Sequence, residues 1–154
     1  MSGLELKIPP PLVAAAVAGA MVVAASLLPP VLALPPGVRM GAALVLAGVG
    51  AGFDVAALRA FRKAQTTVNP LAPQRSTSVV TTGVYRITRN PMYLGLALIM
   101  LGLAVYLASL WALLGPVVFV AFITRFQIQP EERVLAAHFG SDYTAYCAQV
   151  RRWL

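Results

Sequence analysis

A long stretch without charge near the N-terminus constrains this chain more than any other feature. Residues 8–38 contain no Asp, Glu, Lys, Arg or His and consist mostly of aliphatic side chains and proline. About 20 consecutive apolar residues suffice for a helix to cross a membrane. Two proline pairs interrupt the far end, so we expect a helix over about 11–32 and a turn over about 33–38. A cleaved signal peptide is the rival interpretation, although Glu5 dilutes the basic segment that such a peptide carries.

Three further apolar runs extend this pattern along the chain. They lie at about 40–61, 91–107 and 110–126. Only 11% of the 154 residues are charged, whereas soluble domains carry roughly 25%. Ala108-Ser109 leaves room only for a tight turn, so the last two runs should form a helical hairpin. We therefore expect an all-α integral membrane protein with about four transmembrane helices, folded as one domain over residues 1–154.

The chain ends in an amphipathic segment. Pro130 suits the first position of a helix, and Gly140 suits its end. Ser141 is a candidate cap for one last helix. We expect both C-terminal helices to lie in the membrane interface. His138, on the first of them, should be a surface residue rather than a base.

The positive charge of the chain predicts its orientation. The formal net charge is +7, and the Lys and Arg residues flank the apolar runs. Most of them lie in the central connection and the tail, and only Arg39 is left for the opposite side. The positive-inside rule then places both termini and the active site on the cytoplasmic side of an inner or plasma membrane. Anionic headgroups account for this charge, so we expect membrane lipids and no nucleic acid as partners. Cys147 is the only cysteine of the sequence and His138 the only histidine. We therefore expect no disulfide within the chain and no metal site.

A polar segment at residues 83–95 precedes the third apolar run. Asn90 is a good N-cap and Pro91 a good first helical residue, so a helix should begin here. Free backbone N–H groups at a helix start favour an anion such as a carboxylate or a phosphate, and Arg89 adds positive charge beside them. Gly95 permits a close approach of backbone. An ordinary helix start with headgroup-binding arginines is the alternative interpretation.

Aromatic and acidic side chains complete the candidate site. Tyr85 and Tyr93 offer flat surfaces and hydroxyl groups, for stacking or for a cation. A second polar segment, residues 127–132, contains Glu131 and Glu132. Adjacent helical positions point about 100° apart, so we do not expect these two to act as one acid–base pair. One of them suits a ligand amine or ribose hydroxyl as an acceptor.

The second apolar run carries two features of its own. Its residues 48–52 alternate glycine with small residues and predict a face for close helix packing. Asp54 is the only acid inside an apolar run, and such a residue is a functional candidate by default. Because Arg59 and Arg62 follow on the same helix, we expect a structural ion pair for Asp54.

The polar residues share a pattern with a known enzyme family. The pattern consists of Gly83-Val84-Tyr85, Arg89-Asn90-Pro91-Met92-Tyr93-Leu94-Gly95, Glu131-Glu132, Leu135, Phe139-Gly140, Tyr143 and Tyr146. It resembles the isoprenylcysteine carboxyl methyltransferases, which are themselves similar to phospholipid methyltransferases. The resemblance covers about residues 60–154. It implies a cofactor-binding core over 62–154, which follows the two N-terminal spans expected from the apolar runs over about 11–61.

The resemblance implies an integral-membrane enzyme that uses S-adenosylmethionine. In such enzymes the cofactor lies in a cytosol-facing pocket. Carried over to this chain, the lining would be Thr77, Ser78, Val79, Val80, Tyr85, Asn90, Pro91, Met92, Tyr93 and Glu131. Arg89 and Gly95 join these candidates through the arguments from charge and close approach given above. A methyl group would move to a lipophilic or membrane-associated acceptor, such as a prenylcysteine-like carboxylate, a lipid or a thiol.

Two positions depart from the pattern of the family. Asn90 replaces the usual His, and both side chains form hydrogen bonds. Gln127 stands where the eukaryotic carboxyl methyltransferases have an Arg that handles the substrate carboxylate. Arg125 is near but lies on another part of the helix, which puts a carboxylate acceptor in doubt. A neutral amine or thiol acceptor would need a group that takes its proton, and Glu132 is the candidate for this role. The catalytic candidates are thus Arg125, Gln127 and Glu132.

Two other functions remain open at this point. A membrane reductase of the steroid-reductase type has a related architecture and would use NADPH. A small transporter or a helix-packing protein would use the tyrosines only at the membrane interface. The sequence predicts neither the methyl acceptor nor the oligomeric state.

Overall fold

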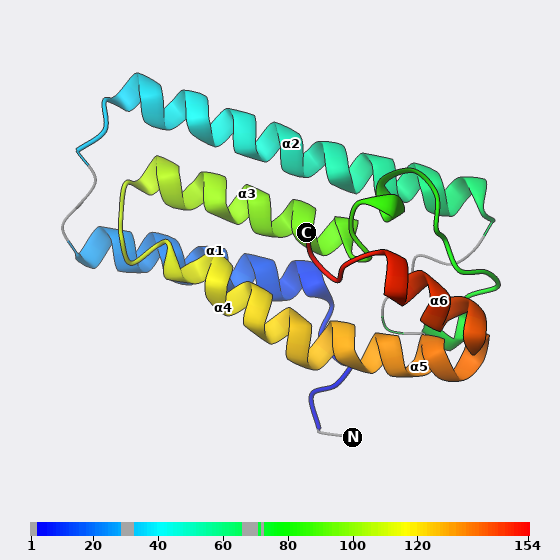
Figure 1. Cartoon of the computed structure of the whole chain (residues 1–154). Coiled ribbons are helices and arrows are strands. Elements are labelled where there is room, and N and C mark those ends of the chain that lie inside the picture. Colours follow the sequence, from blue (N-terminus) through cyan, green and yellow to red (C-terminus); the bar gives the residue numbers. More distant parts are fainter. Residues whose placement is uncertain (1–2, 29–32, 66–70, 72) are drawn as a thin grey trace.

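The structure is a computed structural model that describes residues 3–28, 33–65, 71 and 73–154. These residues form a bundle of helices (Figure 1). The helices are α1 (Pro10–Leu27), α2 (Pro36–Lys63), α3 (Pro91–Leu107), α4 (Leu114–Ile123), α5 (Gln129–Phe139) and α6 (Ser141–Gln149). Two short 3₁₀ turns, Pro73–Arg75 and Gly83–Arg86, lie between α2 and α3. The prediction of an all-helical chain is thus confirmed.

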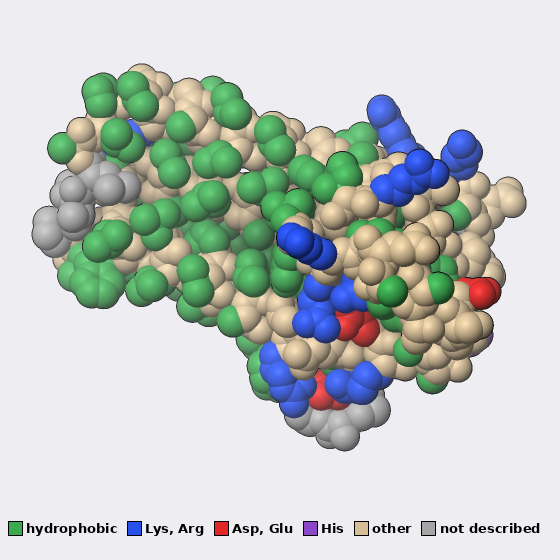
Figure 2. Space-filling model, viewed as in Figure 1, with side chains coloured by type: hydrophobic (Ala, Val, Ile, Leu, Met, Phe, Trp, Pro, Cys, Tyr) green, Lys and Arg blue, Asp and Glu red, His purple; other side chains and the backbone are tan. Residues whose placement is uncertain are grey.

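The four apolar helices run alternately up and down. In Figure 1, α1 ends and α2 begins at the same end of the bundle as the turn between α3 and α4. The start of α1, the α2–α3 connection, α5, α6 and the C-terminus lie at the other end. Figure 2 shows that charged side chains gather at this second end, whereas apolar side chains cover the first half. Of these helices, α1 and α2 are long and apolar enough to cross a membrane, and α3 is a shorter apolar helix.

Helix boundaries agree most closely with the sequence for α3. Predicted at 91–107, it runs from Pro91 to Leu107, since proline begins it and Ala108 ends it with a left-handed φ of 51°. α2 begins at Pro36 instead of residue 40, because proline is accepted in a first helical turn. α1 ends at Leu27 in the described chain, and residues 29–32 of its predicted range lie outside the described residues. The last apolar helix begins at Leu114, four residues after the predicted start at 110.

Packing of α2 against α3 depends on glycines. A Cβ at Gly50 would lie 2.5 Å from the Gly95 carbonyl oxygen and 2.9 Å from the Ile99 side chain. A Cβ at Gly48 or Gly52 would have nothing within 4 Å in the described chain. Within this chain the prediction that residues 48–52 supply a packing face is therefore confirmed for Gly50, whereas Gly48 and Gly52 lie on the exposed side of α2.

α4 continues without a break through a π-turn, Thr124–Ile128, into α5. Pro130 has no N–H to offer the carbonyl group four residues before it, that of Phe126. The backbone N–H of Leu6 donates to this oxygen instead, at 3.1 Å, and so holds the N-terminal segment against the helix. Gly140, with a φ of 55°, ends α5 as predicted. Ser141 is the first residue of α6 and does not cap it, contrary to the prediction, because Gly140 already occupies the cap position.

Candidate functional site

The polar segment before α3 builds the start of that helix. Asn90 occupies the N-cap position, and its carbonyl oxygen accepts a hydrogen bond from the Leu94 N–H at 3.0 Å. Its side-chain amide does not cap the helix as predicted but donates to the Arg152 carbonyl oxygen at 2.9 Å. The first turn of a helix leaves N–H groups without intrahelical acceptors. Those of Met92 and Tyr93 therefore remain as donors at this helix start.

Hydrogen bonds join the two predicted polar segments. The Tyr93 hydroxyl donates to Glu131 Oε2 at 3.0 Å. The side chain of Gln127 forms a hydrogen bond with the same hydroxyl. Burial raises the pKa of Glu131 to about 8, the bond from Tyr93 opposes this shift, and the charge of Glu132 adds to it. At neutral pH Glu131 therefore holds a proton unless a positive group lies beside it.

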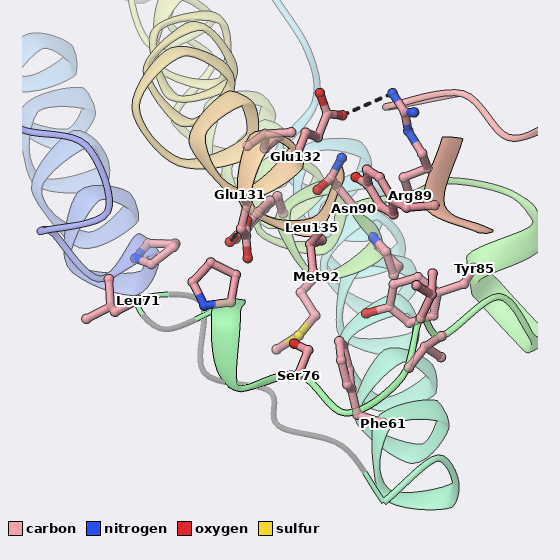
Figure 3. Close-up of a pocket in the computed structure, with 18 of the residues that line it drawn as sticks. Phe61, Leu71, Ser76, Tyr85, Arg89, Asn90, Met92, Glu131, Glu132 and Leu135 are labelled. Atoms are coloured by element: carbon pink, nitrogen blue, oxygen red, sulfur yellow. Dashed lines mark hydrogen bonds and ion pairs between the residues drawn. The ribbon is translucent and has the colours of Figure 1, made fainter. Parts of the chain in front are cut away.

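Glu132 points away from Glu131 and toward Arg89 (Figure 3), and two arginines hold it in place. Arg89 contacts its Oε1 at 3.0 Å. Arg152 donates to both oxygens, from Nε at 3.0 Å and from Nη2 at 2.6 Å. Paired bonds of this kind between a guanidinium and a carboxylate are among the stronger polar contacts in proteins. Both oxygens of Glu132 are thus engaged, and its predicted role as a proton acceptor requires one of these pairs to open.

The C-terminal residues fasten this site through their backbone. The Arg151 carbonyl oxygen accepts from the Arg89 N–H at 3.0 Å. The Arg152 carbonyl oxygen accepts from the Thr88 hydroxyl at 3.2 Å, in addition to the Asn90 amide. Every residue carries such a carbonyl, so no residue type in the tail indicated these contacts, and reasoning from the sequence missed them.

Aromatic side chains form one wall of the site. The rings of Phe61 and Tyr85 meet edge to face, with centroids 5.4 Å apart. The Tyr146 hydroxyl donates to the Tyr85 carbonyl oxygen at 2.7 Å and so ties α6 to the loop before α3. Burial raises the pKa of both Tyr85 and Tyr146. Both phenols therefore stay protonated at neutral pH.

A cavity of about 570 Å³ lies where these elements meet. Small-molecule sites commonly measure about 300–1,000 Å³. Most of the predicted site residues line the cavity: Ser78, Val79, Val80, Tyr85, Arg89, Asn90, Pro91, Met92, Tyr93, Glu131 and Glu132. Figure 3 shows Glu131 and Met92 reaching into it from α5 and α3. Their roles toward a ligand stay predictions, but the structure does bring them to one place.

Two predicted cofactor residues lie outside the lining. Thr77 is exposed, and its hydroxyl donates to the Gln65 carbonyl oxygen at 3.5 Å. Gly95 is buried between α3 and α2, where a Cβ would lie 2.6 Å from the Gly50 carbonyl oxygen. The close approach that Gly95 permits is thus to a neighbouring helix and to the side chain of Asp54.

Two predicted catalytic residues also lie outside the lining. Arg125 points away from the cavity, and its Nη1 lies 2.9 Å from Glu5 Oε1. Arg133 contacts the other oxygen of Glu5 at 2.7 Å. The buried Glu5 therefore holds the N-terminal segment against the continuous helix formed by α4, the π-turn and α5. Gln127 is only 3% exposed and reaches the cavity through its hydrogen bond to Tyr93.

Other residues of the cavity were missed or misinterpreted. The additional lining consists of Pro9, Pro10, Pro11, Asp54, Phe61, Leu71, Pro73, Ser76, Leu96, Ile128, Leu135, Tyr143 and Tyr146. The sequence did single out Asp54, because it is the only acid inside an apolar run and therefore a functional candidate. The ion pair predicted for it with Arg59 or Arg62 is not found among the described residues, because both arginines point outward and are exposed.

Some residues of the cavity lining carry a buried polar atom without a hydrogen-bond partner in the described part of the chain. Among the described residues, buried atoms without a hydrogen-bond partner include Asp54 Oδ1, Ser78 Oγ and Arg89 Nε. All three residues line the cavity. Buried polar atoms in native proteins are nearly always paired.

Comparisons with known proteins agree with this geometry. The chain is 44% identical over 63 residues to an uncharacterized protein of Haemophilus influenzae, a match that covers 41% of this chain and 100% of that protein. No solved structure matches. The model of the phospholipid methyltransferase family matches residues 38–142, which extend from α2 into the start of α6. Since this match spans more than half of the sequence, the chain belongs to the phospholipid methyltransferase family, which includes enzymes similar to isoprenylcysteine carboxyl methyltransferases.

Proposed function

We propose that this protein is an integral-membrane methyltransferase that moves a methyl group from S-adenosylmethionine to a lipophilic or membrane-associated acceptor. The observation that carries the proposal is the cavity at the start of α3, where Tyr93 donates a hydrogen bond to Glu131. Family membership supports the same reaction class. The cofactor would supply the reactive methyl group on its positively charged sulfur.

The residues of the cavity fit this cofactor. The N–H groups at the start of α3 and the guanidinium of Arg89 suit a carboxylate. Glu131 suits an amine or a ribose hydroxyl, and an ammonium group beside it would favour its ionised form. The edge-to-face rings of Phe61 and Tyr85 suit a nucleoside.

Four spans with the site at the cytoplasmic face are part of the proposal. α1 and α2 are candidate spans by length and composition. The alternating directions of α1 to α4 would put the two remaining apolar helices, α3 and α4, across the bilayer as well (Figure 1). The positively charged end carries the cavity, and the positive-inside rule assigns that end to the cytoplasm (Figure 2).

The chain would assist methyl transfer mainly by alignment and by exclusion of water. Transfer from sulfur to a nucleophile depends on the position of the two reacting atoms more than on an acid–base pair. Pro91, Leu96 and Ile128 give the cavity an apolar side, against which the acyl or prenyl chain of an acceptor could pack. The contacts of Glu132 with Arg89 and Arg152 tie α5 to the segment before α3 and to the C-terminal tail beside the cavity.

A thermal-shift experiment tests the proposal. S-adenosylhomocysteine should raise the melting temperature of the protein in detergent, and Glu131→Ala should abolish the shift. Asp142→Asn, which changes an exposed acid on α6, is the matched control and should keep it. Stabilisation by NADPH instead would favour a reductase. Stabilisation by neither compound would favour a protein without enzymatic activity, and both outcomes contradict the proposal.

A further inference from the structure

The N-terminal segment, residues 3–9, packs against the place where α4 passes into α5. Glu5 is buried there, and its two carboxylate oxygens lie 2.9 Å from Arg125 Nη1 and 2.7 Å from Arg133 Nη2. Both arginine side chains are about half exposed, at 50% and 56%. One buried carboxylate therefore joins two arginines that lie on opposite sides of the α4–α5 transition in one continuous helix.

This continuous helix is irregular at the transition. Residues 124–128 form a π-turn, a feature that is frequent at functional sites, and Pro130 offers no N–H to the Phe126 carbonyl oxygen. The backbone N–H of Leu6 donates to that oxygen at 3.1 Å, from a residue whose φ of 56° is left-handed. Such a backbone is unfavourable for residues other than glycine. Contacts with the helix therefore hold the bend at Leu6, and the N-terminal segment in turn supplies a hydrogen bond that the helix lacks.

The residues between the two arginines carry polar contacts of the cavity. Gln127 and Glu131 lie about one helical turn apart, and both form a hydrogen bond with the Tyr93 hydroxyl. Arg125 comes two positions before Gln127, and Arg133 comes two positions after Glu131. Side chains two positions apart on a helix point about 200° apart. The arginines thus reach the N-terminal segment on one side of the helix, while Gln127 and Glu131 face the cavity on the other.

The N-terminal segment also continues into the wall of the cavity. Pro9, Pro10 and Pro11 line the cavity at the start of α1. Proline restricts the backbone, so three successive prolines couple the position of this wall to the contacts of the segment before it. Residues 3–9 precede the part of the chain that matches the family, which begins at residue 38. The family match therefore assigns no role to them.

From these contacts we propose that Glu5 is a positioning residue of the candidate site. It holds the helix on both sides of the α4–α5 transition and so keeps Gln127 and Glu131 against the Tyr93 hydroxyl. The inference rests on the proposed function, in which Glu131 contacts the cofactor. Glu5 itself is not part of the described cavity lining, so its effect on a ligand passes through the helix.

Calorimetric titration with S-adenosylhomocysteine tests this inference in dodecyl maltoside micelles, well below the melting temperature of each variant. Glu5→Gln keeps the size of the side chain and removes its charge. It should weaken the affinity about 2- to 30-fold, the range of indirect coupling through packed contacts. Arg133→Gln acts on the exposed side of the same ion pair, so it tolerates the fold better and should weaken the affinity in the same direction. Lys7→Gln removes an exposed charge from the same segment and, as the matched control, should bind like the wild type.

A double-mutant cycle separates positioning from general support of the fold. Tyr93→Phe removes the hydroxyl group against which Gln127 and Glu131 are held. If Glu5 acts through this contact, Glu5→Gln should weaken binding much less in the Tyr93→Phe background than in the wild type. Equal losses of affinity in the two backgrounds overturn the assignment. An affinity that stays unchanged in both Glu5→Gln and Arg133→Gln overturns it as well.

A readout without ligand separates this inference from the function on which it rests. The Trp153 indole N–H donates to the Thr124 hydroxyl at the start of the π-turn, and Trp111→Phe leaves Trp153 as the single tryptophan. In this background Glu5→Gln should shift the emission maximum to longer wavelength, and Lys7→Gln should not. Emission and affinity that respond equally to both substitutions overturn the inference alone. If S-adenosylhomocysteine fails to bind the wild type, the methyltransferase proposal itself is wrong, and the positioning role falls with it.

Discussion

Substituting single glycines of α2 provides a sharp test of how this helix faces α3. In Gly50→Ala the new Cβ would lie 2.5 Å from the Gly95 carbonyl oxygen, and real Cβ contacts essentially never fall below 3.0 Å. The backbones must therefore separate by at least 0.5 Å, the difference between these two distances. They meet along the most extensive interface between two helices in the described chain. Overpacking of this kind costs about 1–3 kcal/mol.

The matched controls are Gly48→Ala and Gly52→Ala on the same helix. Their new Cβ atoms meet nothing within 4 Å, so alanine should be neutral or stabilising by up to about 1 kcal/mol through its helix propensity. Unfolding is measured by circular dichroism in dodecyl maltoside micelles with increasing dodecyl sulfate. Gly50→Ala should unfold at a clearly lower dodecyl sulfate fraction than either control. Equal loss of stability in Gly48→Ala and Gly50→Ala would refute the described orientation of α2.

Two further predictions concern the polar contacts of the site. Folding raises the pKa of Glu131 from 4.5 to about 8, so the folded state holds a proton more tightly than the unfolded state. The stability of the ligand-free protein should therefore fall as the pH rises from about 4.5 to about 8, and Glu131→Gln should flatten this part of the profile of melting temperature against pH. Arg152→Ala removes the paired bonds to Glu132 and should destabilise the protein by about 1–2 kcal/mol, since the guanidinium is partly exposed. Arg151→Ala, which keeps the carbonyl bond to Arg89, should have little effect in the same unfolding assay, and equal effects of both substitutions would contradict the assigned contacts.

Local chemistry explains what the sequence predicted well. Pro91 after Asn90 fixes the start of α3, and a glycine with positive φ at position 140 ends α5. Helical geometry also explains why Glu131 and Glu132 point to different sides (Figure 3). The two polar segments meet at one cavity because the alternating directions of the apolar helices bring the start of α3 and the start of α5 to the same end of the bundle (Figure 1).

Contacts between distant segments explain what the sequence did not predict. The sequence alone does not distinguish the glycines at positions 48, 50 and 52. The orientation of α2 about its own axis determines which of them faces α3, and it is Gly50 that meets Gly95. Glu5 lies 120 positions before Arg125 in the sequence. The residues around Glu5 or around Arg125 therefore give no indication of the ion pair between them. The Trp153 indole N–H likewise donates to the Thr124 hydroxyl at 3.2 Å and joins the C-terminus to the end of α4.

Asp54 shows how a local rule misled. The prediction paired it with arginines that follow on the same helix, but side chains on one helix are direct neighbours only at three or four positions apart. Arg59 is five positions away and Arg62 eight, and both are exposed. Asp54 instead packs against Gly95 at the cavity, which no pattern within α2 reveals.

The most direct test of the central claim is an experimental structure determined with S-adenosylhomocysteine. The proposed function predicts density for the nucleoside and the amino-acid portion in the cavity, with the carboxylate at the start of α3 and the amine or a ribose hydroxyl within hydrogen-bonding distance of Glu131. Density elsewhere on the protein, or a cavity that stays empty at saturating ligand, would contradict it.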